Sequence, residues 1–275
     1  MAYLELTNVG KSYGPRHVLD GVSLTLDEGE FVSIVGISAS GKTTLLKMAS
    51  GLLAPSHGAV TLGGEPVKEF SREASIVFQN YSLLPWLSAL ENVYLAVESS
   101  NPDWPKARLT EQSEKYLKMV GLGAAMQKRP SQLSGGMRQR VAIARAFAVE
   151  PRVIFLDEPF GALDALTRAT LQQELARMCS AAARPVTALM ITNNVDEAIL
   201  LSDRIMALGR GPKASLSPAV PVDMPRPRTA DMLLHDARAV RLRATLAGFL
   251  TKPGAPVRHP GGYTPLNTSV AMEAR

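Results

Sequence analysis

The sequence predicts an α/β protein whose mainly parallel sheet is covered by helices on both faces. A glycine-rich turn joins an apolar strand at 31–35 to a helix at 45–49, and a second apolar strand at 153–157 ends in paired acids. Strand and helix patterns then alternate up to residue 208. Buried parallel strands read as continuous apolar runs, as these do, and alternation with helices is typical of that architecture.

The glycine-rich turn is a phosphate-binding loop. Residues 36–44 read GISASGKTT between the strand and the helix, which is the setting that the pattern G-x-x-x-x-G-K-[ST] requires. Small residues let the main chain curl so that backbone N–H groups point at phosphate oxygens, and the helix N-terminus adds partial positive charge. Lys42 can reach the β- and γ-phosphates, and the Thr43 hydroxyl can ligate Mg²⁺.

The paired acids stand at the carboxyl end of a buried strand, where ligands of parallel sheets bind. Asp157 is placed to hold Mg²⁺, usually through water, and Glu158 is placed to act as general base on an attacking water. A strand that merely stops at a solvated acid pair is the alternative. The phosphate-binding loop in the same chain favours the catalytic interpretation.

Composition narrows the class of protein. The chain has 275 residues, 46% of them hydrophobic, which suits one large domain or one domain with appendages. No apolar run approaches the roughly 20 residues that span a bilayer, and no secretory leader pattern is present, so we expect a soluble protein whose membrane role is by association. The single cysteine, Cys179, excludes an internal disulfide framework and fits a reducing cytoplasm.

The chain divides into a body at 1–210 and an extension at 211–275. Strand signals disappear between 87 and 150, which indicates a helical insert within the α/β domain. The extension is basic and rich in proline and arginine, with one helix expected over 229–250 and disorder over 252–275. We expect strands at 4–9, 22–26, 59–62, 75–78, 152–157, 186–192 and 204–208, helices at 89–98, 107–120, 135–149, 165–182 and 195–201, and a turn at 11–14.

A third motif decides the family. Residues 133–140 read LSGGMRQR and open a helix, with Ser134 as a good N-cap, while Gly135 and Gly136 permit close backbone approach to an anion. This stretch resembles the signature motif of ATP-binding-cassette (ABC) ATPases, and the resemblance covers about residues 3–210. It implies a P-loop NTPase fold of the ABC cassette type, with a mainly parallel core, an antiparallel β subdomain and an inserted helical subdomain.

The resemblance implies roles for further residues. Tyr13 is similar to the aromatic on which adenine stacks, Gln79 to the glutamine that senses Mg²⁺ and the attacking water, and Asp164 to the loop that links two ATP sites. In this family two cassettes bind head to tail, so each ATP lies between one phosphate-binding loop and the partner's signature motif. The expected ATP-binding residues are therefore Tyr13, Gly36, Ser38, Ala39, Ser40, Gly41, Lys42, Thr43, Thr44, Ser134, Gly135, Gly136 and Asp164. The expected Mg²⁺ ligands are Thr43, Gln79 and Asp157. The expected catalytic residues are Glu158, Gln79 and Asn193.

Two positions depart from the family pattern. Ala39 stands where the loop usually has glycine, at a cost of roughly 1 kcal/mol if the backbone is left-handed there. Asn193 takes the place of the switch histidine, and none of the four histidines of the chain lies nearby. An amide can donate to a γ-phosphate oxygen but carries no charge and cannot shuttle a proton. Either Asn193 is a weaker γ-phosphate sensor, or the site is catalytically impaired.

The stretch LPWL at 84–87 resembles the membrane-facing region of the importer branch for nitrate, sulfonate and taurine. Within that branch, residues 191–204 and 222–228 resemble the nitrate/nitrite/cyanate ATPases. The resemblance implies an ATPase peripheral to the cytoplasmic face of the inner membrane. Its expected partners are membrane permease subunits, a substrate-binding protein indirectly, and a second cassette in a homodimer or in a heterodimer with a histidine-containing cassette.

Other functions remain open at this point. A sulfonate or taurine importer is one alternative, and a regulatory cassette that binds ATP without turnover is another. The presence of Glu158 opposes the regulatory role. A soluble cassette protein that works on ribosomes or DNA is the third, but the chain has no nucleic-acid module, so we expect no nucleic-acid partner.

Overall fold

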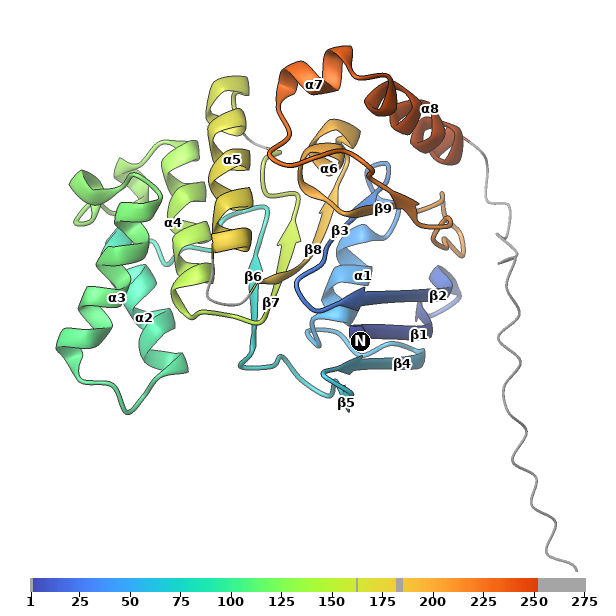
Figure 1. The fold of residues 1–275 in the computed structure, drawn as a ribbon. Coiled ribbons are helices and arrows are strands. Elements are labelled where there is room, and N and C mark those ends of the chain that lie inside the picture. Colours follow the sequence, from blue (N-terminus) through green and yellow to red (C-terminus); the bar gives the residue numbers. More distant parts are fainter. Residues whose placement is uncertain (1, 162, 182–184, 252–275) are drawn as a thin grey trace, which may run out of the picture.

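The computed structural model describes residues 2–161, 163–181 and 185–251, which form two sheets with flanking helices (Figure 1). The larger sheet has the strand order β10-β9-β3-β8-β7-β6. All of its neighbouring pairs are parallel except the edge pair of β10 and β9. The predicted mainly parallel core is therefore confirmed, with β3 at Phe31–Val35, β6 at Ala74–Val77, β7 at Val153–Asp157, β8 at Thr187–Thr192, β9 at Arg204–Ala207 and β10 at Val220–Pro221.

The smaller sheet is antiparallel, in the order β2-β1-β4-β5. The turn expected at 11–14 is misplaced, because strand pairing continues until Tyr13 faces Arg16. The chain reverses at Gly14, whose φ of +57° is readily adopted only by glycine. The strands are β1 at Ala2–Tyr13, β2 at Arg16–Asp27, β4 at His57–Leu62 and β5 at Glu65–Pro66.

Helices cover the larger sheet and form a lobe beyond its β6 edge (Figure 1). The lobe contains α2, α3 and α4, and the sheet is flanked by α1, α5 and α6. Ser88 begins α2 with a capping box, because its hydroxyl accepts from the Glu91 N–H while the Glu91 carboxylate accepts from the Ser88 N–H. The bounds are α1 at Lys42–Ala49, α2 at Ala89–Ser100, α3 at Lys106–Met119, α4 at Gly135–Ala148, α5 at Ala165–Ala181 and α6 at Val195–Leu201, with short 3₁₀ turns at Gly123–Ala125 and Pro130–Gln132.

The buried strands read as continuous apolar runs because both faces contact hydrophobic side chains. On β7, Ile154 and Leu156 belong to the core that includes α4 and α5, whereas Val153 and Phe155 belong to the core that includes α1 and the antiparallel sheet. Consecutive residues of a strand point to opposite faces. The two cores therefore hold β7 from both sides and fix the position at which its acids emerge.

The single helix expected over 229–250 is wrong, because the chain forms α7 at Ala230–His235 and α8 at Ala237–Thr251. Asp236 separates them in an extended conformation, and its carboxylate accepts a hydrogen bond of 2.8 Å from the Arg238 N–H at the start of α8. Aspartate competes with the helix in this way and favours capping positions. The residues expected to be disordered, 252–275, lie outside the described part.

Part of the predicted extension packs closely on the body of the protein. Val222, Met224, Leu233, Ala239 and Leu246 are buried in one cluster with side chains of β3, α6 and β9. The two-residue strand β10 adds to the edge of the larger sheet beside β9. The described residues beyond 210 thus contribute to the same structure as the core.

Candidate nucleotide site

A cleft of about 470 Å³ opens at the carboxyl ends of the parallel strands. Most of its lining was predicted from the sequence, and the lining comes from four separate regions of the chain. The predicted residues that line it are Tyr13, Ser38, Ala39, Gly41, Lys42, Thr43, Thr44, Gln79 and Glu158. The fold therefore brings the aromatic, the phosphate-binding loop, the glutamine and the second acid to one place.

The loop has the tight curl that its sequence predicts. Gly41 has a φ of +104°, and a Cβ there would lie 3.1 Å from side-chain carbons of Val18 and Leu19. Ala39 has a φ of +62°, so the residue that departs from the family pattern does adopt the left-handed region. Gly41 precedes α1, whose first turn has neither an acidic residue nor a side-chain cap. The free N–H groups of that turn are consequently available to an anion.

Two further loop residues favour the same ligand. A Cβ on Gly36 would lie 2.8 Å from the Ser40 Oγ, which explains the glycine. The Ser40 Oγ is buried and has no hydrogen-bond partner among the described residues. Buried polar atoms are usually paired, so this orphaned hydroxyl fits a site that is completed by a polar ligand.

Lys42 is buried with its ammonium group turned back on the loop. Its Nζ donates to the carbonyl oxygens of Gly36 at 3.0 Å and Ile37 at 2.9 Å, and lies 3.3 Å from Glu158 Oε1. Only 4% of its side chain is exposed. A buried ammonium group is stable only with such partners, so the loop and Glu158 together hold the cation at the cleft.

The two acids have different surroundings. Asp157 Oδ1 accepts a 3.2 Å hydrogen bond from Thr43 Oγ1. Burial raises the pKa of Asp157 above its ordinary range, and the Thr43 hydrogen bond opposes that rise. Glu158 has a φ of +45° and accepts from Gln79 Nε2 at 3.5 Å and from Asn193 Nδ2 at 3.4 Å. The strained backbone at Glu158 turns its carboxylate toward the cleft side chains.

Glu197 fixes residues 192–194, the segment that contains Asn193. Its Oε2 accepts a 2.7 Å hydrogen bond from Thr192 Oγ1, and that hydroxyl in turn accepts from the Asn194 N–H. Asn194 also caps α6, through a 2.9 Å bond from the Asp196 N–H. These contacts flank Asn193 on both sides and leave its amide directed at Glu158.

Ser134, Gly135, Gly136 and Asp164 are not among the residues that line this cleft. Ser134 caps α4 by accepting from the Met137 N–H, and α4 lies in the helical lobe apart from α1 (Figure 1). Asp164 Oδ1 accepts from the Thr167 N–H at 3.0 Å, and this bond lowers its pKa. A Cβ on Gly136 would lie 2.5 Å from the Thr167 methyl, so close packing of α4 on α5 is a second reason for that glycine.

Sequence reasoning missed Arg16 and Val18, which also line the cleft. Arg16 directly follows the Tyr13–Gly14–Pro15 turn and pairs with Tyr13 across the hairpin. A cationic residue three positions after Tyr13, the aromatic residue predicted to bind adenine, was the feature of the sequence that could have placed Arg16 in the cleft. Ala162, in the loop before Asp164, lies outside the described residues.

Comparisons with known proteins identify the class to which this fold and site belong. A family model described as ABC transporter matches residues 19–161. The chain belongs to the ABC transporter family, and it is an ATPase of that family whose activity is coupled to transport.

Two transport ATP-binding proteins and one solved cassette structure are similar to most of the chain. The chain is 46% identical over 252 residues to the bicarbonate transport ATP-binding protein CmpD of Synechococcus elongatus, with 90% of each chain covered. It is 43% identical over 252 residues to the nitrate import ATP-binding protein NrtD of that organism, with 90% of this chain and 91% of the relative covered. The dimeric post-hydrolysis structure of the cassette MJ0796 with ADP and Pi matches with a TM-score of 0.72 and 32% identity, over 80% of this chain and 99% of that one. The predicted ABC cassette fold is confirmed.

Proposed function

We propose that the cleft binds ATP with Mg²⁺ and hydrolyses the γ-phosphate bond to drive import of a small oxyanion. The observation that carries this proposal is the meeting of Lys42, Glu158, Gln79 and Thr43 in one cleft. A cation, uncapped helix N–H groups and the unpartnered Ser40 hydroxyl fit a polyphosphate. Tyr13, half exposed at the cleft, offers an aromatic face to the base.

The residues near Asp157 fit Mg²⁺. Magnesium in nucleotide sites is held by one or two carboxylates and hydroxyls together with phosphate oxygens. Thr43 and Asp157 already hydrogen-bond to each other, and Gln79 lines the same cleft. We assign these three residues to the ion, which would neutralise charge on the phosphates when bound.

Glu158 is proposed as the general base. A water attacks the γ-phosphorus, its proton passes to the Glu158 carboxylate, and the bond to the bridging oxygen breaks to release ADP and phosphate. Asn193 and Gln79 both donate to Oε2 of Glu158 and so orient the base. Lys42 stands close enough to Glu158 to exchange this ion pair for contact with phosphate oxygens.

The signature motif is proposed to act on the ATP of a facing cassette. Ser134 and the glycines after it lie outside this cleft, whereas the resemblance places them against the partner's nucleotide. MJ0796 is dimeric in the matching structures. We propose a dimer for this chain, and a heterodimer with a histidine-containing cassette because Asn193 supplies no titratable group.

Trp86 supports contact with a membrane permease. Its side chain is 65% exposed, on a loop held by Asn92, whose amide donates to the carbonyl oxygens of Leu84 and Leu87. A fixed loop that presents an aromatic residue is typical of an interface. Within the described ranges, no helix is long and apolar enough to cross a bilayer. We propose a peripheral subunit on the cytoplasmic face of the inner membrane, linked through the permease to a substrate-binding protein.

The transported anion is proposed to be nitrate or bicarbonate. Nitrate is the sequence prediction, and the bicarbonate and nitrate relatives have nearly the same identity to the chain. The test is uptake by cells that carry the complete transporter, with and without Lys42→Ala in this chain. Loss of uptake of one anion identifies the substrate, whereas unchanged uptake of both anions contradicts the proposal.

Trp86→Ala should release the chain from membranes while leaving its ATP binding intact.

A further inference from the structure

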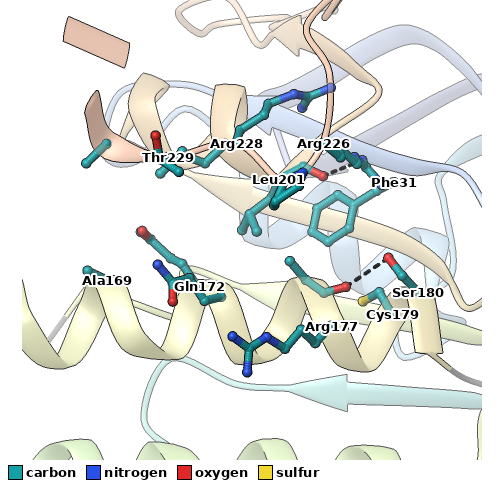
Figure 2. A pocket seen from close by; sticks show the side chains of 15 residues that line it. Phe31, Ala169, Gln172, Arg177, Cys179, Ser180, Leu201, Arg226, Arg228 and Thr229 are labelled. Atoms are coloured by element: carbon teal, nitrogen blue, oxygen red, sulfur yellow. Dashed lines mark hydrogen bonds between the residues drawn. The ribbon is translucent and has the colours of Figure 1, made fainter. Parts of the chain in front are cut away.

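A second cavity, of about 560 Å³, lies between α5, the end of α6 and the segment 226–230 (Figure 2). Cavities of this size are typical of small-molecule sites. None of the residues that line it belongs to the nucleotide cleft. The cavity is therefore a separate feature of the fold.

The walls are mostly apolar. Phe31, Leu200, Leu201 and Ala176 supply hydrocarbon surface, and the aromatic ring of Phe31 lies at one end (Figure 2). Burial raises the pKa of the Cys179 thiol to about 12, so this side chain is neutral and adds apolar surface rather than a nucleophile. A ligand with an aromatic or branched apolar body matches these walls.

The Gln172 amide faces the cavity without a protein partner among the described residues. Gln172 is only 8% exposed, and its amide forms no hydrogen bond within the described part of the chain. Figure 2 shows this side chain rising from α5 into the cavity. The amide is therefore free to donate to, and accept from, a ligand that enters the cavity.

The charge of the lining favours an anion. Of the fifteen lining residues three are arginines, Arg177, Arg226 and Arg228, and none is acidic. Arg226 stands beside Phe31 (Figure 2), where its Nη2 contacts the Leu201 carbonyl at 2.7 Å and Asp203 at 3.0 Å. Its remaining N–H groups have no partner among the described residues. These groups can bind a carboxylate, for which guanidinium geometry is well suited.

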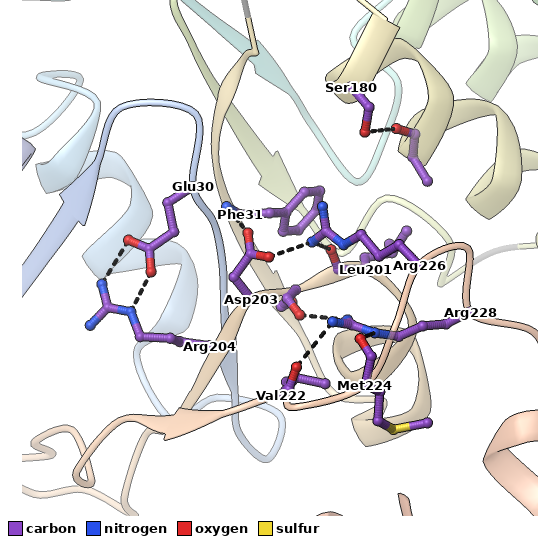
Figure 3. Close-up of polar contacts among 12 residues, drawn as sticks. Glu30, Phe31, Ser180, Leu201, Asp203, Arg204, Val222, Met224, Arg226 and Arg228 are labelled. Carbon is purple, nitrogen blue, oxygen red and sulfur yellow. Dashed lines mark hydrogen bonds and ion pairs between the residues drawn. The ribbon is translucent and has the colours of Figure 1, made fainter. Parts of the chain in front are cut away.

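The wall opposite α5 is held rigidly by Arg228. Its guanidinium donates to four backbone carbonyls, those of Met224, Ile199, Ser202 and Val222, at 2.6–3.1 Å. Figure 3 shows the contacts with Met224 and Val222. This contact joins the segment 222–228 to the carboxyl end of α6. The cavity is consequently preformed, which lowers the entropic cost of ligand binding.

We propose that this cavity binds a small amphipathic organic anion, with its carboxylate at Arg226, its apolar body against Phe31 and Leu201, and a second polar group at the Gln172 amide. The inference does not rest on the proposed function, because binding is measured without nucleotide. The helix α5 follows Asp164 and the helix α6 follows Asn193. The ligand would therefore lie between the two helices that continue from these segments of the ATPase site.

The test uses 6-hydroxy-2-naphthoate as probe, followed by isothermal titration calorimetry and saturation-transfer NMR on the full chain. We expect one site with a dissociation constant of about 1 mM or tighter. The analogue 2-naphthoate, without the hydroxyl, should bind roughly three- to tenfold more weakly. The neutral 6-hydroxy-2-naphthamide should bind at least about threefold more weakly, because it cannot pair with a guanidinium. Absence of binding up to 5 mM, or equal binding of the neutral amide, overturns the proposal.

Two variants locate the site. Gln172→Leu should abolish the advantage of the hydroxylated probe over 2-naphthoate, and an advantage that persists in this variant contradicts the assignment. Ala176→Trp should fill the cavity and abolish binding, whereas Thr170→Trp, on an exposed part of α5 outside the lining, is the matched control. Wild-type binding by Ala176→Trp overturns the location. Circular dichroism checks that each variant is folded. If Ala176→Trp does not fold, the result with Gln172→Leu decides whether the ligand binds in this cavity.

Discussion

The Asn193 Nδ2 donates a 3.4 Å hydrogen bond to Oε2 of Glu158, while the other carboxylate oxygen of Glu158 lies 3.3 Å from the Lys42 ammonium group. The proposed base thus has an uncharged amide on one side and a cation on the other. A histidine at the same place could also donate a hydrogen bond, and it could take up a proton. The identity of residue 193 therefore bears on the rate of hydrolysis more than on nucleotide binding.

Replacing Glu158 by Gln should separate binding from hydrolysis. The variant keeps the shape of the side chain but removes the proton acceptor, so we expect the ATPase rate to fall about 10²- to 10⁴-fold. Nucleotide affinity should stay within about threefold of wild type, because Lys42 retains its two carbonyl contacts. Steady-state ATPase assays and calorimetry with ATP check both halves. Equal turnover of the two proteins would exclude Glu158 as the base.

Thr43→Val should weaken the magnesium dependence of nucleotide binding. Valine has the shape of threonine but removes the hydroxyl that donates to Asp157 at 3.2 Å. We expect the affinity for ATP to fall about tenfold with Mg²⁺ present and to change little with EDTA, because the phosphate contacts of Lys42 and of the loop remain. Thr43→Ser, which keeps the hydroxyl, is the control. An equal loss with and without Mg²⁺ would argue against the ligand role.

Arg228→Met should destabilise the protein. Methionine keeps much of the side-chain length but leaves four buried carbonyls without their donor, which costs about 3 kcal/mol or more. Burial lowers the pKa of Arg228 to about 10, so the side chain is still charged at neutral pH. Thermal unfolding should show a Tm lower by roughly 6–12 °C. The exposed Arg241→Met is the control, and a similar small change in both variants would contradict this account.

The pH dependence of stability should report on Glu197. Burial raises its pKa above the ordinary value of 4.5, so the folded protein holds this proton more tightly than the unfolded chain does. The stability from Glu197 is present below pH 4.5 and is lost as pH rises through the raised pKa. Glutamine does not titrate, so the Tm of wild type relative to Glu197→Gln should fall between pH 4.5 and 7.5. A difference that stays constant or grows would contradict the shift.

The local elements of the nucleotide site could be predicted from the sequence because each depends on neighbours in the chain. Strand, turn and helix at 31–49 fixed the loop, and the apolar run before Asp157 fixed the acid pair at a strand end. The cleft brings the loop and Glu158 together. The contact of Asn193 with Glu158 joins residues 35 positions apart, and only the order of β8 and β7 in the sheet places them together.

Other features depend on tertiary contacts that leave little trace in the sequence. The periodicity over 229–250 is helical throughout, and the break at Asp236 arises because its carboxylate bonds to Arg238. Arg228 lies in the extension that the sequence marks only as basic, but it is buried and donates to carbonyls of α6 and of the 222–224 segment. The second cavity is likewise made by segments distant in sequence, so no single motif indicates it.

The most direct test of the central claim is the ATPase rate of this chain alone, compared with that of Asn193→His. The claim is that the chain hydrolyses ATP at Glu158 and that the uncharged amide at residue 193 limits the rate. We predict measurable turnover that rises at least about tenfold in Asn193→His, with ATP affinity within about threefold of wild type. Wild-type turnover as fast as that of the histidine variant would contradict the claim.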